Sequence, residues 1–154
     1  MKNLSLIFLT LLISFSGRCS HLMGGEIVVQ NDQVGNYEIL LTLYRDVSGI
    51  LLNSNQTLKV FDAAGNQVST IISTLDSSAF HPIFGIQNMS LLPNNCYLTE
   101  VYFYSAIFPC FTPGDYTVTW NNCCRNPAIV NLINPGSLSM FLDCSFTVDL
   151  TTTT

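Results

Sequence analysis

Alternation of apolar and polar side chains with a period of two dominates this sequence and limits what it can fold into. The clearest case is the segment 36–46, NYEILLTLYRD, where only Leu40 interrupts the polar face. Successive side chains of a β-strand point to opposite faces of a sheet, whereas a helix needs a period of 3.6. The segment therefore predicts a half-buried strand. Its apolar face carries Tyr37, Ile39, Leu41 and Leu43.

Six further segments show strand patterns, and turn residues separate them. The turns 31–36 (NDQVGN), 63–65 (AAG) and 112–115 (TPGD) each predict a hairpin between the strands that flank them. No stretch of ten residues has a helical period, so we expect an all-β, antiparallel β-sandwich, Ig-like or, as the alternative, a jelly roll. The six segments are 25–30 (GEIVVQ), 57–62 (TLKVFD), 66–73 (NQVSTIIS), 96–108 (CYLTEVYFYSAIF), 115–122 (DYTVTWNN) and 141–150 (FLDCSFTVDL).

Residues 1–19 have the pattern of a secretory signal peptide. A basic residue precedes the apolar run 4–15, which is shorter than the about 20 residues that a membrane-spanning helix needs. Cleavage can follow Cys19 or Ser16, and lipid anchoring at Cys19 is a weaker alternative because Arg18 fits that processing poorly. We therefore expect the protein to be secreted or displayed on the cell surface, with no transmembrane span.

The exported chain is predicted to form one domain, residues 20–150, followed at 151–154 by a threonine tail or the start of a linker. Without the leader, three basic residues face ten acidic ones, a formal charge of −7. So few cations cannot build the phosphate-binding surface that nucleic acid requires. High hydrophobicity also argues against disorder, so the composition indicates a folded exoprotein with no nucleic-acid partner.

Cysteines in an exported protein are expected to form disulfides. Cys123 and Cys124 are adjacent on a predicted strand, so they point to opposite faces and are expected to have separate partners. A vicinal disulfide between them is the less favoured alternative, because it distorts the peptide. The hairpin predicted at 112–115 would bring Cys96 and Cys110 near this pair. The candidates are odd in number, so the connectivity stays open. We expect no metal and no cofactor, because no paired C-x-x-C motifs or clustered histidines accompany these thiols. The disulfide candidates are Cys96, Cys110, Cys123, Cys124 and Cys144.

Two arginines are candidates for structural ion pairs. Arg45 continues the apolar parity of its strand and should lie at the end of the core face. A buried guanidinium needs a carboxylate or several carbonyls, and Glu26, Asp143 and Asp149 are the candidate partners. Arg125 is expected to be solvated or paired.

No catalytic constellation is recognisable, so we do not expect an enzyme. His21 and His81 accompany no nucleophile elbow, and the carboxylates are scattered along polar strand faces. A secreted hydrolase is therefore the least favoured alternative. A carbohydrate-binding module is the more serious one, because exposed aromatic rings can act as stacking platforms. The candidate rings belong to Trp120, Tyr44, Tyr102 and Tyr104.

Three segments in order resemble a known family. The segments 20–27 (SHLMGGEI), 37–50 (YEILLTLYRDVSGI) and 123–132 (CCRNPAIVNL) resemble the N-terminal domain of large secreted surface proteins of Bacteroidota. Those chains often carry PKD-type or Ig-like repeats and a C-terminal gliding-motility-associated sorting domain. The resemblance extends to about Pro135 and is loose over 51–92.

The resemblance implies a non-catalytic extracellular module that serves adhesion or structural presentation, in a gliding or type IX secretion context. Surface glycans or other cell-surface proteins would be its partners. The family usually has a cysteine where this chain has Val47. The loss of that thiol is consistent with an odd cysteine count and puts the family's disulfide scheme in doubt here.

Overall fold

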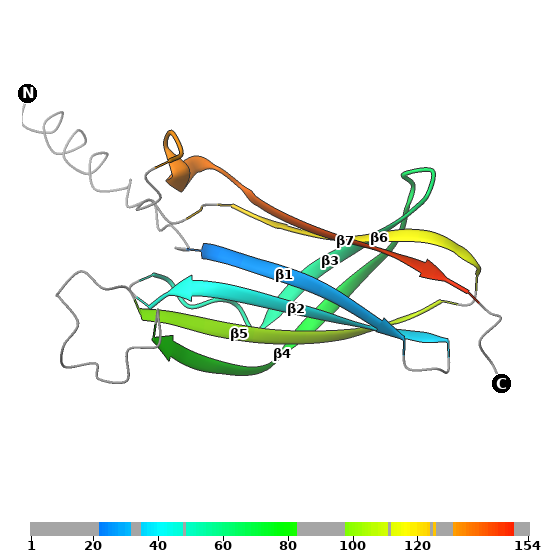
Figure 1. Cartoon of the computed structure of the whole chain (residues 1–154), viewed down its shortest axis with the longest axis horizontal. Helices are drawn as coiled ribbons and strands as arrows, with labels where there is room; N and C mark the ends of the chain where they lie inside the picture. The colour runs from blue at the N-terminus through cyan, green and yellow to red at the C-terminus, as the bar shows by residue number, and fades with distance from the viewer. Residues whose placement is uncertain are drawn as a thin grey trace, which may run out of the picture.

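The computed structural model describes residues 22–31, 35–47, 49–82, 98–110, 112–123, 125 and 131–149, with the backbone alone at 79–82 and 98. Within these ranges the chain forms seven antiparallel strands and a 3₁₀ turn, η3 (Pro135–Ser137) (Figure 1). The all-β antiparallel prediction is confirmed, whereas the leader and the threonine tail lie outside the described residues. The strands are β1 (Leu22–Asn31), β2 (Asn36–Asp46), β3 (Asn55–Asp62), β4 (Gln67–Pro82), β5 (Leu98–Pro109), β6 (Gly114–Asn122) and β7 (Met140–Val148).

The strands form one sheet in the order β1-β2-β5-β4-β3-β6-β7. The long strand β4 joins its two halves, because residues 67–74 pair with β3 and residues 74–82 pair with β5. An irregularity between Leu75 and Ser77 marks the change of partner, as expected where a bulge bends a strand. Figure 1 shows the β3–β4 hairpin running obliquely between the half made of β1, β2 and β5 and the half made of β6 and β7.

The two halves face each other across an aromatic core. Phe108 on β5 lies with its ring centroid 6.0 Å from that of Tyr116 on β6 and 6.2 Å from that of Phe146 on β7. Tyr37 on β2 lies 5.3 Å from the same Phe146 ring. These separations are typical of favourable aromatic pairs. The core is completed by the inward side chains that the two-residue period predicts, among them Ile39, Leu41, Leu43, Leu58, Val60, Val118 and Trp120.

The hairpin predicted at 112–115 is wrong. Strand β5 pairs with β2 and β4, whereas β6 pairs with β3 and β7, so the turn carries the chain from one half of the sheet to the other. The hydroxyl of Tyr116 donates a hydrogen bond to the Thr112 carbonyl oxygen at 3.1 Å, which fixes this corner. A Pro-Gly turn signals a change of direction, but it does not say which strand the chain will pair with afterwards.

The two edge strands, β1 and β7, approach each other at one end. Leu22 forms an isolated parallel bridge with Arg125. A Cβ atom on Gly25 would meet the Thr42 carbonyl oxygen at 2.7 Å and the Leu142 side chain of β7 at 2.9 Å. The close approach of β1 to its neighbours therefore depends on the missing side chain at Gly25.

We expect Gly25→Ala to lower the free energy of unfolding by about 1–3 kcal/mol, the usual cost of overpacking. Gly24→Ala is the matched control, because its Cβ would make ordinary contact with the Tyr44 ring at 3.6 Å. That change should be neutral or stabilise by up to about 1 kcal/mol. Urea unfolding of both variants tests this, and equal midpoints would contradict the packing argument.

Candidate functional site

Arg45 lies where its parity predicts, buried at the end of the core face with 3% of its surface exposed. Its partner is Glu100, the residue directly opposite on β5, and not Glu26, Asp143 or Asp149 as expected. The Arg45 Nε donates to Glu100 Oε2 at 3.2 Å, and its Nη2 contacts the same oxygen. Glu100 is the partner because strand pairing places β5 beside β2.

The remaining bonds of this ion pair hold a loop in place. Arg45 Nη1 donates to the Gly49 carbonyl oxygen at 2.6 Å, and the Tyr102 hydroxyl donates to Glu100 Oε2 at 2.9 Å. Burial raises the pKa of Glu100, but the hydrogen bonds from Arg45 and Tyr102 outweigh it and hold the pKa below its usual value. The charged groups of Arg45 and Glu100 therefore form their hydrogen bonds with partners inside the protein, which indicates a structural role.

The other candidates for ion pairs lie elsewhere. Glu26 is exposed on β1 and accepts a hydrogen bond from the Tyr44 hydroxyl at 3.4 Å. Arg125 donates from Nε to the Ser139 carbonyl oxygen at 3.2 Å. These contacts tie neighbouring segments together and bring neither side chain to Arg45.

The disulfide prediction is wrong for two of its five cysteines. Cys110 and Cys144 are free thiols, the first buried and the second half-buried. Cys110 lies at the β5–β6 corner, where its Sγ donates to the Thr112 carbonyl oxygen, and the nine-residue strand β6 separates that corner from Cys123 by about 30 Å. A disulfide needs Cα atoms within about 7 Å. Cys123 is disulfide-bonded, and Cys96 and Cys124 lie outside the described residues.

Three of the four predicted stacking platforms face the core. Trp120 is 2% exposed, and its Nε1 donates to Gln56 Oε1 at 3.1 Å. Tyr102 and Tyr104 are also buried, and Tyr44 is half-buried. The stacking hypothesis is therefore wrong at Trp120, Tyr102 and Tyr104, because the parity that places Tyr116 in the core also turns Trp120 inward.

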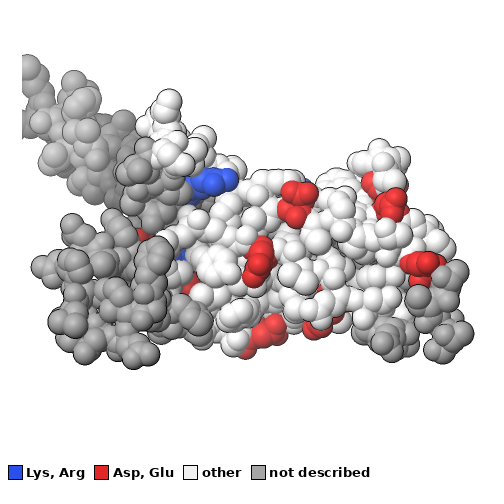
Figure 2. All heavy atoms as spheres, in the orientation of Figure 1, with Lys and Arg blue, Asp and Glu red and all other residues white. Residues whose placement is uncertain are grey.

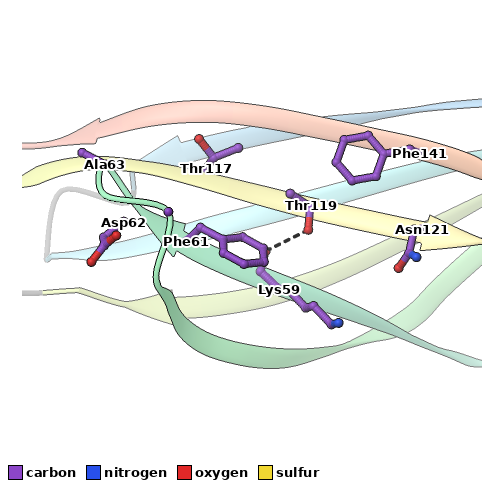
Figure 3. A pocket seen from close by; sticks show the side chains of 9 residues that line it. Lys59, Phe61, Asp62, Ala63, Thr117, Thr119, Asn121 and Phe141 are labelled. Atoms are coloured by element: carbon purple, nitrogen blue, oxygen red, sulfur yellow. Dashed lines mark hydrogen bonds between the residues drawn. The ribbon is translucent and has the colours of Figure 1, made fainter.

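A groove of about 490 Å³ opens instead on the outer face of β3, β6 and β7 (Figure 3). Its floor is the hydroxyl row of Thr117 and Thr119, with an aromatic ring on each neighbouring strand. The face lies on the opposite side of the sheet from the buried Val118 and Trp120. The groove is lined by Lys59, Phe61, Asp62, Ala63, Gly65, Thr117, Thr119, Asn121 and Phe141.

The two phenylalanines lie diagonally across β6. Phe61 pairs with Thr117, and Phe141 pairs with Asn121. Two strand spacings of ~4.8 Å and four residues of ~3.3 Å place their Cα atoms about 16 Å apart. Phe141 is 57% exposed. The groove therefore offers two separated apolar platforms with the Thr119 hydroxyl between them.

A well-ordered turn and two opposite charges form one side of the groove. Asp62 accepts hydrogen bonds from the backbone N–H of Asn66 at 2.8 Å and from its side-chain amide at 3.0 Å. These bonds lower the pKa of Asp62, so the carboxylate is ionised at neutral pH. Gly65 supplies the positive φ of 81° that the turn requires. The exposed Lys59 adds an ammonium group beside this fixed carboxylate.

Sequence reasoning missed this groove, although a signal was present. Leu58 and Val60 point into the core, so Phe61 falls on the polar face of its strand, and Phe141 does the same relative to Leu142. An aromatic residue out of phase with the core pattern marks a surface platform. The side chain of His81, on β4, and His21 lie outside the described residues.

The surface of the described residues carries dispersed charge. Figure 2 shows acidic side chains spaced singly over the visible face. Among the described residues, no group of three or more His, Cys, Asp or Glu side chains is placed to hold a metal ion. Nor does the described part of the chain contain a helix with the length and hydrophobicity needed to cross a membrane. Comparison with protein-family models, curated proteins and solved structures finds no match to this chain.

Proposed function

We propose that the chain is an Ig-like module of an exported surface protein, and that it serves adhesion or structural presentation. The observation that carries the proposal is the strand order. Constant-type Ig domains have the strands A-B-E-D in one sheet and C-F-G in the other. Taken in chain order as A to G, the present strands have the order A-B-E-D-C-F-G. The difference is that strand D, here β4, also pairs with strand C.

The corner between β5 and β6 gives independent support. Many Ig-like domains have a tyrosine near the start of strand F whose hydroxyl bonds to the backbone a few residues upstream. Tyr116 occupies that position on β6, and its hydroxyl donates to the Thr112 carbonyl oxygen. The feature favours the Ig-like fold over the jelly roll.

The distribution of polar groups supports binding in place of catalysis. Arg45, Glu100 and Trp120 bond to partners inside the protein, so these polar side chains serve the core. The groove over β3, β6 and β7 faces outward with aromatic, hydroxyl, amide and charged groups together. Such a mixed and ordered outer face suits recognition of a partner surface. Together with the resemblance to Bacteroidota surface proteins, it supports an adhesive role.

Export and adhesion are tested separately. The full chain, produced in a Bacteroidota host with and without residues 2–19, should reach the cell surface or medium only when the leader is present, as detected by surface biotinylation. Beads coated with the exported protein should then be retained on Bacteroidota cells more than beads coated with an unrelated β-sandwich. Retention supports adhesion, whereas export without retention favours structural presentation. An intracellular product would overturn the proposal.

A further inference from the structure

We propose that the groove over β3, β6 and β7 binds an uncharged oligosaccharide. This inference rests on the adhesive function proposed above. Phe61 and Phe141 would stack against sugar rings, and the hydroxyls and amide between them would bond to sugar hydroxyls. Saccharide recognition would then lie on the outer face of the sheet, opposite the inward-facing Trp120.

The aromatic rings set the size of the ligand. The C–H-rich face of a pyranose packs on an aromatic ring through apolar contact and the ring's negative face. The two phenylalanines lie about 16 Å apart at Cα, which exceeds the width of one sugar ring. A ligand that contacts both therefore has at least two linked sugars. In Figure 3 the Phe61 and Phe141 rings lie on either side of Thr119.

The polar lining matches a ligand rich in hydroxyl groups. Thr119 donates its hydroxyl hydrogen to the Lys59 carbonyl oxygen at 3.5 Å, which leaves its oxygen lone pairs available as acceptors. Asn121 adds an amide that can both donate and accept, and the ionised Asp62 is a strong acceptor. Because hydrogen bonds and the β3–β4 turn already hold Thr119 and Asp62 in place, binding requires little further ordering.

Strand pairing argues against an extended peptide as the ligand. Strand β3 pairs with β4 and β6, and β6 pairs with β3 and β7. Where β3 and β6 pair, at residues 59–62 and 116–119, the backbone has a neighbouring strand on both sides. Peptide capture by strand addition needs a free sheet edge, and the free edge nearest the groove is the outer side of β7, beside the groove and not within it. Recognition on this face therefore depends on side chains, which suits a saccharide.

The charge of the face favours an uncharged ligand. Lys59 contributes the ammonium group of the groove, and the ionised Asp62 lies beside it. Asp143 on β7 pairs in register with Thr119, so a second carboxylate flanks the same row. A uronic acid or a sulfated sugar would meet a face with more negative than positive charge. The structure therefore assigns a neutral oligosaccharide to the groove.

The test uses the exported full chain on an array of neutral cello-, xylo-, manno- and chito-oligosaccharides beside charged pectic and alginate oligosaccharides. A neutral series should bind, and titration calorimetry with it should show about tenfold weaker binding for Phe141→Ala, the loss expected from one stacking platform. Phe103→Ala is the matched control, since it removes a 39% exposed phenylalanine from the outer face of β5. Its affinity should not change. Thr119→Val should also weaken binding without altering the near-UV spectrum.

Results that differ from these expectations would each overturn a specific part of the inference. Binding to charged oligosaccharides alone would refute the assignment of a neutral ligand. Equal losses for Phe141→Ala and Phe103→Ala would place the site elsewhere. If no oligosaccharide binds although coated beads still adhere to cells, the saccharide inference fails and the adhesive function stands. If the beads also fail to adhere, the adhesive function fails with it.

Discussion

Replacement of Glu100 with alanine is expected to lower the free energy of unfolding by about 3–5 kcal/mol. The change leaves Arg45 with its guanidinium buried and without a counter-charge, since its side chain is only 4% exposed. The Tyr102 hydroxyl also loses its acceptor. Removal of the partner of a buried charge is among the few single substitutions that destabilise a domain this strongly.

Urea unfolding followed by tryptophan fluorescence measures the effect. Glu26→Ala is the control, because it removes a carboxylate of the same kind from an exposed position on β1 and should change the stability by no more than about 0.5 kcal/mol. Similar losses in both variants would show that the ion pair contributes little, and would remove the argument that it holds the loop after β2.

The same pair predicts how stability depends on pH. Folding lowers the pKa of Glu100, because its bonds from Arg45 and Tyr102 outweigh the effect of burial. The stabilisation is therefore fully present above the unfolded pKa of about 4.3 and is lost as the pH falls through the folded pKa. In Glu100→Gln, which cannot titrate, the decline of stability below about pH 4 should be shallower than in the wild type.

Replacement of Trp120 with alanine should cost about 3–5 kcal/mol, the range for removal of a large aromatic side chain from a core. Trp120 is among the most completely buried large residues described. Its loss would leave a cavity between the halves of the sheet and remove the donor that Gln56 Oε1 accepts from. Both effects act on the core and neither on the outer face.

Phe141→Ala provides the contrast, because its ring is mostly exposed and its removal should change the stability by no more than about 0.5 kcal/mol. Differential scanning calorimetry on both variants is the direct measurement, since the Trp120 variant lacks the fluorescent probe. A small effect at Trp120 with a large one at Phe141 would reverse the assignment of core and surface.

The local sequence pattern predicts where the strands lie, but it does not always predict where they end. Segment 36–46 alternates except at Leu40 and forms β2 over the same residues. Strand β4 continues past the predicted end at Ser73 to Pro82, over a stretch with little alternation. Pairing with β5 holds that second part in strand conformation, and such long-range pairing leaves no trace in a local pattern.

The Arg45–Glu100 pair and the groove both depend on the order of the strands, which the sequence pattern does not reveal. The burial of Arg45 follows from its parity, but its pairing with Glu100 requires that β5 lie beside β2. Phe61 and Phe141 are 80 residues apart in sequence and lie on one face only because β3 and β7 flank β6. The sequence around each phenylalanine predicts that its side chain points outward. That the two side chains line the same groove depends on the order of the strands in the sheet.

The double pairing of β4 also has a mechanical consequence. In two separate sheets, a tensile load could part the layers by disrupting side-chain packing alone. Here the hydrogen-bonded ladders run without interruption from β1 to β7 through β4. In Figure 1, β1 begins near one end of the long axis and β7 finishes near the other. A pull between those points loads the ladders in shear, so that many bonds lying across the strands resist together.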